Sequence, residues 1–298
     1  MDKNKKNWII LLSSVLICVI ASVSSISNAQ TEKNKQTKQT NKKSEKIKFV
    51  AVGDAGTGGI YQYNVAKAMK NKCENNSCDF GLMLGDNIYE YGVSSVKDSQ
   101  FITKFELPYK DLNFPFYMVL GNHDYLGNPN AQVEYTKKSN KWIMPSRAYS
   151  FSKGIVDFFA IDSNSLSLSQ EKDLIKKLDN SKARWKIVFA HHPRYSNGLH
   201  GNASYFLGKV LDNALCNRAD MYIAGHDHNK EHLKKVCGVE YLVVGSGGGS
   251  LRPVRQASNS LFAKSSYGFS WFEVDKNSLH FQFIDTDGKV EYEYTTKK

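Results

Sequence analysis

The sequence predicts an α/β fold built from two mixed β-sheets that pack together, with helices outside them. Over roughly the first two thirds of the chain, short apolar runs alternate with helical patterns, as in sheets whose strands are joined by helices. The last part of the chain instead contains strand patterns separated by turn residues at 275–277 and 285–289, which is typical of antiparallel strands. Two packed sheets accommodate the number of strands that these patterns predict.

The individual elements follow from periodicity and from turn residues. Apolar runs predict strands at 47–52, 80–84, 116–120, 155–161, 185–190, 221–224, 240–244, 270–274, 279–284 and 290–295. Helical patterns predict helices at 61–71, 170–180 and 203–215, and weaker helical patterns occupy 93–107 and 128–138. No internal repeat divides this part of the chain, so we expect one domain from 47 to 298.

Length and composition are those of a globular chain with a large hydrophobic core. Of the 298 residues, 41% are hydrophobic and 12% are aromatic. The formal net charge is +11, but residues 1–29 carry +2 and residues 30–46 carry +4, which leaves +5 for the remainder. Because the excess is concentrated in a solvated basic tail, we expect no nucleic-acid partner.

The N-terminus has the three parts of a secretory signal peptide, predicted at 1–29. A start with three lysines precedes an apolar run over 8–23, and the small residues Ser27 and Ala29 follow it. The apolar run is short for a membrane span, so an uncleaved anchor is the less favoured alternative. Residues 30–46 are predicted to be a flexible linker rich in Lys, Asn, Gln and Thr. We expect a secreted or periplasmic monomer without stable membrane association after cleavage.

Four cysteines remain after the predicted signal peptide: Cys73, Cys78, Cys216 and Cys237. An even number in an exported chain indicates disulfides, and four cysteines allow three connectivities. A bond between Cys73 and Cys78 would close a small surface loop. A bond between Cys216 and Cys237 would join the two sides of the segment that contains residues 225–228. Free buried thiols are the alternative.

Five of the predicted strands are followed directly by side chains that bind metal ions. These side chains belong to Asp54, Asp86, Tyr89, Asn122, His123, Asp124, His191, His192, His226 and His228. Such residues meet at the carboxyl ends of strands, so the pattern predicts one metal site assembled from several loops. Oxygen and imidazole donors without a thiolate suit iron, manganese, zinc or magnesium.

Three features refine this prediction. Asp86 lies in the middle of the set, and its carboxylate can bridge two cations about 3.5–4 Å apart, an arrangement that supports attack of water on a phosphate ester. The phenol of Tyr89 indicates Fe(III) at one position, because a phenolate is a strong donor to a hard trivalent ion. His226 and His228 are two residues apart, so both imidazoles project to one side of an extended backbone.

The order of these motifs resembles that of the calcineurin-like metallophosphoesterases. The motifs are Gly-Asp at 53–54, Gly-Asp-x-x-Tyr at 85–89, Gly-Asn-His-Asp at 121–124, Val-x-x-His at 188–191 and Gly-His-x-His at 225–228. Tyr89 narrows the resemblance to the purple acid phosphatases, and the stretches 85–93 and 121–128 are similar to the small tartrate-resistant (type 5) branch. The resemblance covers about 47–250 by motif and implies a four-layer sandwich, with two mixed sheets flanked by helices.

The resemblance also implies roles for the matching residues. Fe(III) would be bound by Asp54, Tyr89 and His228, and a divalent Fe, Zn or Mn ion by Asn122, His191 and His226, with Asp86 bridging the two ions. His191 rather than His192 fits the ligand position of the pattern. His123 matches the substrate-contacting histidine, and His200 is the expected partner in protonation of the leaving group.

The implied function is that of an exported acid phosphatase. It would hydrolyse phosphomonoesters by attack of a hydroxide bound to a dinuclear metal centre, without a phosphoenzyme. One alternative is a phosphodiesterase or nucleotidase on the same scaffold. Another is a secreted metal-binding or redox protein without hydrolase activity.

Other polar residues receive more modest interpretations. We expect Asp124 to support a ligand, Asp227 to be a turn residue and His232 to lie on the surface. The glycines at 247–249 either approach the site closely or form a flexible loop.

Overall fold

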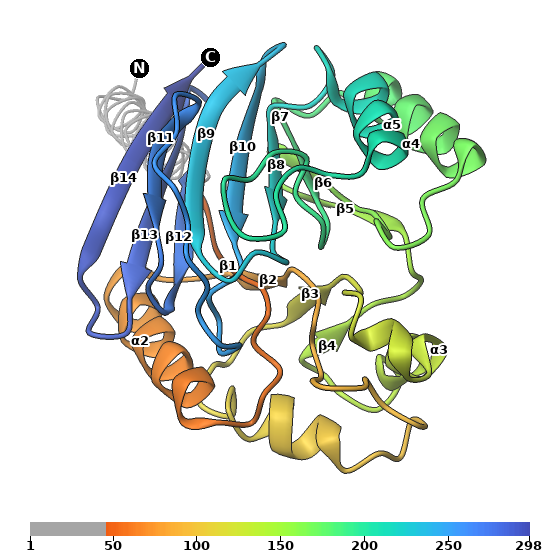
Figure 1. Ribbon diagram of the computed structural model, residues 1–298, viewed down its shortest axis with the longest axis vertical. Helices are drawn as coiled ribbons and strands as arrows, with labels where there is room; N and C mark the ends of the chain where they lie inside the picture. The colour runs from red at the N-terminus through yellow and green to blue at the C-terminus, as the bar shows by residue number, and fades with distance from the viewer. Residues whose placement is uncertain (1–45) are drawn as a thin grey trace, which may run out of the picture. The chain divides into compact units, whose positions relative to one another are not determined.

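The computed structural model describes residues 46–298, which Figure 1 draws in colour. The predicted signal peptide (1–29) and the predicted linker (30–46), apart from Lys46, lie outside the described residues. Within 46–298, none of the helices combines the length and the apolar character needed to cross a membrane. The first strand begins at Ile47, where the sequence predicts it.

Two seven-stranded mixed sheets form the centre of this part of the chain. The first has the order β14 (Val290–Lys297), β13 (Ser278–Asp285), β12 (Gly268–Val274), β1 (Ile47–Val52), β2 (Phe80–Met83), β3 (Phe116–Met118) and β4 (Trp142–Ile143). The second has the order β11 (Ser260–Lys264), β9 (Lys230–Val236), β10 (Val239–Val244), β8 (Met221–Ala224), β7 (Trp185–Phe189), β6 (Val156–Ala160) and β5 (Tyr149–Lys153). Strands β1 to β4 are parallel, and β12 to β14 extend the first sheet by antiparallel pairing.

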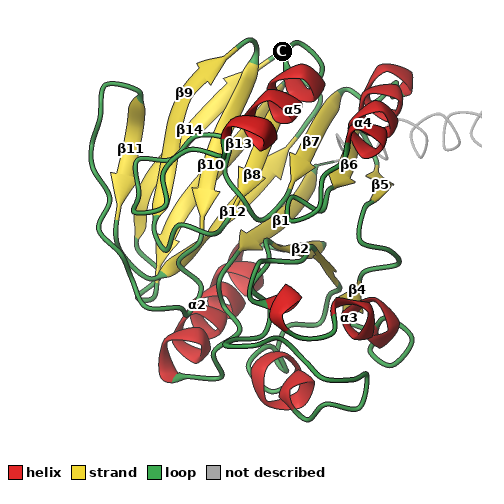
Figure 2. Cartoon of the chain, turned by 45° about the vertical axis from the view of Figure 1, so that its right-hand side comes forward, coloured by secondary structure: helices red, strands yellow, loops and turns green. Residues whose placement is uncertain are grey.

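Aromatic side chains fill the space between the sheets, and helices cover the outer faces. Phe49 on β1 stacks on Phe80 and Phe272 within the first sheet. Its ring meets the edge of Phe158 on β6 of the second sheet, with ring centroids 5.3 Å apart. Helices α4 (Leu168–Asn180) and α5 (Tyr205–Leu215) lie side by side against the second sheet (Figure 2), and α2 (Ile60–Asn76) contacts β12. The predicted α/β sandwich with two mixed sheets is confirmed.

Serine side chains cap the beginnings of α4 and α5, whereas α2 has no side-chain cap. The predicted helices at 61–71, 170–180 and 203–215 are confirmed as α2, α4 and α5; the predicted ends of α4 and α5 are exact, and the other boundaries shift by one to five residues. Before α4, the Ser167 hydroxyl accepts from Gln170 N while the Gln170 side chain accepts from Ser167 N, which satisfies two otherwise unpaired donors. The weak pattern at 128–138 contains the short helix α3 (Pro129–Tyr135), whereas 93–107 contains a π-helical turn at Ile102–Glu106.

Strand β9 departs from the sequence prediction because it buries charged side chains. Lys230, Glu231 and His232 are all inaccessible to solvent, so the strand carries no apolar alternation that would reveal it. The expectation that His232 lies on the surface is wrong. Its ring nitrogens lie 3.2 Å from the carboxylate of Glu240 and 3.0 Å from the hydroxyl of Tyr292, and these polar partners allow it to be buried.

The structure contains two disulfides, Cys73–Cys78 and Cys216–Cys237. The first closes the loop at the end of α2. The second joins the residue that ends α5 to the turn between β9 and β10. Of the three possible connectivities, the structure therefore contains the one that pairs near neighbours in the chain.

A buried ion pair joins the two sheets. Lys230 Nζ on β9 lies 2.6 Å from Glu291 Oε2 on β14, and both side chains are almost inaccessible to solvent. Lys264 Nζ on β11 lies 2.7 Å from the other oxygen of Glu291, but its side chain is 49% exposed. The two lysines therefore contact the same carboxylate from different environments.

We predict that Lys230→Met lowers the free energy of unfolding by about 3 kcal/mol, because it removes one partner of a buried pair. Lys264→Met is the matched control and should cost at most about 1 kcal/mol, because solvent screens the exposed ammonium group. Urea unfolding of both variants measures the difference. Equal losses would contradict a special role for the buried lysine.

Candidate metal centre

The candidate site lies where loops of both sheets meet. Asp54 follows β1, Asp86 and Tyr89 follow β2, Asn122 follows β3, His191 follows β7, and His226 and His228 follow β8. The first three strands belong to the first sheet and the last two to the second. The structure therefore brings together, from both sheets, all seven residues that the sequence suggests as metal ligands.

These residues form two clusters of donor atoms. In the first, the Tyr89 hydroxyl lies 3.2 Å from Asp54 Oδ1 and 3.0 Å from His228 Nε2. In the second, His191 Nε2 lies 3.0 Å from Asn122 Oδ1 and 3.1 Å from His226 Nδ1. Ligand atoms at bond lengths of about 2.1 Å around one octahedral cation lie about 3 Å from one another, so both clusters have the spacing of a coordination shell.

Asp86 stands between the clusters. Its Oδ2 lies 3.6 Å from His191 Nε2 in the second cluster. Donor atoms of Asp54, Asp86 and His191 all lie within 4.8 Å of one another, which links the first cluster to the second. This is the position that a bridging carboxylate needs.

Backbone carbonyls orient two of the imidazoles. His191 Nδ1 donates to Leu84 O at 2.9 Å, and His228 Nδ1 donates to Ser250 O at 2.7 Å. A carbonyl only accepts hydrogen bonds, so in each neutral ring the proton is on Nδ1 and the lone pair of Nε2 faces the carboxylates. Histidines that bind metals are commonly held in this way.

The charges of the site also fit a bound cation. The carboxylates of Asp54 and Asp86 are buried, and among the described residues their only ion-pair contacts are with histidines. Burial, together with the nearby charges of Asp54 and Asp86, raises the pKa of the Tyr89 phenol well above its usual range. Buried carboxylates without a cationic partner are costly, and a phenolate here would add to that cost. The donor set therefore fits cations that compensate this charge.

Three of the seven residues have an uncommon backbone conformation. The φ angles of Asp54, Asp86 and His226 are 56°, 49° and 70°. Residues other than glycine rarely adopt such angles, and each costs on the order of 1–3 kcal/mol. Gly121 makes room for the bend, because a Cβ atom there would lie 2.1 Å from Asp86 Oδ1. These strained turns direct the three side chains from the strand ends toward the donor clusters.

Asp124 holds two of the loops together, as expected. Its buried carboxylate accepts from Gly121 N at 2.8 Å and from the backbone N–H groups of Asn87 and Ile88 at 3.1 Å. It also accepts from Gln132 Nε2 at 2.8 Å. The loop that carries Asp86 and Tyr89 is thereby fixed relative to the loop that carries Asn122.

The two histidines with predicted catalytic roles lie at the edge of the site. His123 Nδ1 donates to Glu90 O at 2.7 Å, and its Nε2 lies 4.0 Å from Asp86 Oδ2. The exposed ring of His200 stacks on His226, with ring centroids 4.1 Å apart. A donor atom of His192 also lies within 4.8 Å of donor atoms of His191 and His226, but Nδ1 of His192 pairs with the hydroxyl of Ser163 at 2.9 Å.

Sequence reasoning gave too small a role to Asp227 and did not identify Arg252. Asp227 is buried rather than a simple turn residue, and it accepts from His200 N at 2.9 Å and from Ser196 Oγ at 2.5 Å. It therefore anchors the loop that carries His200. The guanidinium of Arg252 donates to His200 Nε2. The signal that could have pointed to Arg252 is its place three residues after Gly249, the last glycine of the stretch.

That glycine-rich stretch approaches the site closely. Gly249 N donates to Asp54 O at 2.7 Å, and a Cβ atom on Gly249 would lie 2.8 Å from His228 Cε1. The residues at 247–249 are buried. Of the two alternatives that the sequence allows, the structure shows the close approach.

Comparison with known proteins places this geometry in a family. The model of the calcineurin-like phosphoesterases matches residues 47–230, and that of the iron/zinc purple acid phosphatase-like protein C matches 238–291. Purple acid phosphatase 3 of Arabidopsis thaliana is 31% identical over 279 residues, which cover 82% of this chain and 76% of that protein. Tartrate-resistant acid phosphatase type 5 of Sus scrofa is 29% identical over 287 residues, which cover 82% and 84% of the two chains.

A solved structure is also similar. GAP50, described as the anchor in the inner membrane complex of Plasmodium, has a TM-score of 0.74 and 28% sequence identity, covering 85% of this chain and 89% of that chain. The family models together span most of the residues that form the two sheets and the donor clusters. This chain therefore belongs to the purple acid phosphatases, a family of calcineurin-like phosphoesterases.

Proposed function

We propose that this protein is an exported acid phosphatase that hydrolyses phosphomonoesters at a dinuclear metal centre. Membership of the family makes it a metal-dependent phosphoester hydrolase. The observation that carries the proposal is the pair of donor clusters joined by Asp86, with His123 and His200 beside them and not among the donors.

The donor types suggest which ions are held. Asp54, Tyr89 and His228 would hold Fe(III), and Asn122, His191 and His226 would hold divalent Fe, Zn or Mn, with Asp86 shared. Phenolate and carboxylate oxygens suit the harder ion, and imidazoles with an amide oxygen suit the softer one. The chemistry supplied by such a bound pair is polarisation of the phosphoryl oxygens and activation of water.

The residues of the chain orient the ester and move the proton. Because His123 Nδ1 donates to Glu90 O, its Nε2 is the ring nitrogen left for the phosphoryl group, and it donates there as part of an imidazolium, which carries a proton on both nitrogens. Because His200 Nε2 accepts from Arg252, its Nδ1 is the atom that can carry a proton to the leaving oxygen. Arg252 also brings a fixed positive charge next to the site.

Export is supported by two independent features. The predicted signal peptide occupies 1–29. The structure also contains two disulfides, and disulfides form and persist in oxidising compartments. We therefore infer a secreted or periplasmic monomer in which residues 47–298 form the catalytic domain and residues 30–46 a linker.

A role without catalysis is the second candidate, because GAP50 is described as an anchor. All seven predicted ligands are present in this chain and converge, and both predicted proton donors are present. We therefore favour the enzyme. Activity of the native chain toward a phosphomonoester separates the two candidates.

We predict that the native protein hydrolyses p-nitrophenyl phosphate in preference to bis(p-nitrophenyl) phosphate, and that His191→Ala lowers the rate by more than about a hundredfold. The matched control is His192→Ala, which should keep its metal content while His191→Ala loses one of the two ions. Metal analysis, circular dichroism and initial rates test this. Full activity in a folded His191→Ala variant would contradict the site, and preference for the diester would favour the phosphodiesterase alternative.

We predict that Tyr89→Phe abolishes the visible absorption of the iron-loaded protein and leaves hydrolysis within about tenfold of the native rate. The absorption requires a phenolate bound to Fe(III), whereas the remaining donors still surround the ion. Tyr91→Phe is the control, because Tyr91 is 74% exposed and close in sequence. An unchanged spectrum in Tyr89→Phe would show that Tyr89 does not bind iron.

We predict that His200→Ala slows hydrolysis of an alkyl phosphate at least about a hundredfold but slows hydrolysis of p-nitrophenyl phosphate much less. A poor leaving group needs the proton that His200 would supply, and nitrophenolate does not. His280→Ala, on the distant strand β13, is the control and should affect neither ester. Equal losses for both esters would argue against proton transfer by His200.

A further inference from the structure

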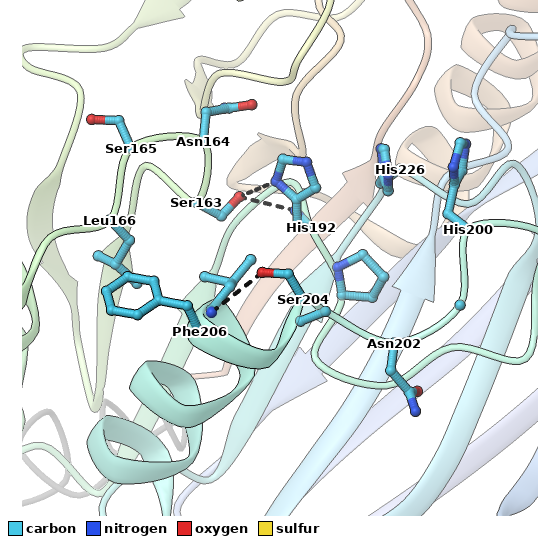
Figure 3. Close-up of a pocket in the computed structure, with 14 residues that line it drawn as sticks. Ser163, Asn164, Ser165, Leu166, His192, His200, Asn202, Ser204, Phe206 and His226 are labelled. Carbon is cyan, nitrogen blue, oxygen red and sulfur yellow. Dashed lines mark hydrogen bonds between the residues drawn. The ribbon is translucent and has the colours of Figure 1, made fainter.

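A pocket of about 690 Å³ adjoins the candidate metal centre (Figure 3). His226, from the second donor cluster, and His200 form one side of it. The opposite side is made by the loop at 163–166 and by the first turn of α5 with the segment before it. A group bound in this pocket would therefore lie directly beside the predicted proton donor.

The wall of this pocket carries no fixed charge. Among the described residues that line it, none is Asp, Glu, Lys or Arg. The neutral polar groups are partly used by the protein, since Ser163 Oγ pairs with His192 and Asn164 Nδ2 donates to Leu120 O at 2.8 Å. Arg252 donates to the Nε2 atom of His200 but does not itself line the pocket, so a further phosphate or a carboxylate on the bound group would lose its hydration without a cation in the wall to contact.

Apolar side chains provide the remaining contact surface. Leu166, Phe206 and Leu207 line the pocket, and the Phe206 side chain is 54% exposed at the start of α5. An aromatic ring left open beside a concave site offers area that a bound apolar group can cover.

We propose that this pocket receives the leaving group of the phosphoester and selects uncharged aryl or apolar alcohols. The proposal rests on the proposed phosphatase function and specifies its substrate class. Phosphoryl transfer to water places the leaving oxygen beside the group that protonates it, and His200 holds that place at the wall of the pocket. Phosphomonoesters of neutral aromatic alcohols are then preferred over substrates such as pyrophosphate, whose leaving group is a further anion.

The test compares phenyl phosphate, ethyl phosphate and pyrophosphate on the metal-loaded native protein and on Phe206→Ala. We expect kcat/KM for phenyl phosphate to fall about tenfold in Phe206→Ala, mainly through KM, while ethyl phosphate is unaffected. Tyr205→Ala is the matched control, because Tyr205 neighbours Phe206 but does not line the pocket. Equal effects of the two substitutions would overturn the proposal.

A second variant tests the charge argument without loss of apolar contact. Ser165 is an exposed residue of the wall, so Ser165→Arg adds a cation there without disturbing the core. It should raise the pyrophosphate to phenyl phosphate ratio of kcat/KM at least about fivefold. An unchanged ratio would show that leaving groups do not contact this wall.

Binding of non-hydrolysable ligands provides a readout besides turnover. Calorimetry should show benzylphosphonate binding about tenfold more tightly than methylphosphonate to the native protein, and this advantage should vanish in Phe206→Ala. If the native protein hydrolyses none of the esters, the proposed function fails. If it hydrolyses them but shows no benzyl advantage, only the assignment of the pocket fails.

Discussion

The buried negative charge of Asp54 and Asp86 is the constraint on which the rest of the candidate centre depends. Among the described residues, neither carboxylate has a lysine or arginine as its partner, although the chain as a whole is basic. The surrounding protein instead offers lone pairs, because backbone carbonyls hold the protons of His191 and His228 away from the carboxylates. Strained turns and close glycines keep these donors together. The arrangement has the features of a cation site rather than of an ion-pair network.

Much of this could be predicted from the sequence because two signals agree. The apolar strands near the centre of each sheet are buried on both faces, so each appears in the amino-acid sequence as a continuous hydrophobic run. Polar donors directly after those runs then fall at one edge of the sheets. The predicted start of β1 and the predicted end of α5 match the structure, whereas α5 begins two residues after its predicted start.

The rest could not be predicted because it depends on partners that are distant in sequence. Strand β9 buries Lys230 and His232, and only Glu291, Glu240 and Tyr292, contributed by other strands, make that burial possible. The position of Arg252 next to His200 likewise depends on how two loops meet, 52 residues apart in the chain. Local patterns describe one strand at a time, whereas these contacts exist only after the sheets have packed.

Because both sheets contribute predicted metal ligands, metal binding would couple to folding. Loops after β1, β2 and β3 belong to one sheet and loops after β7 and β8 to the other, so ions held by all five would bind only the closed sandwich. By mass action, such binding adds to the free energy that keeps the sheets packed. The supply of metal ions would then govern how long the folded protein lasts, in addition to how fast it works.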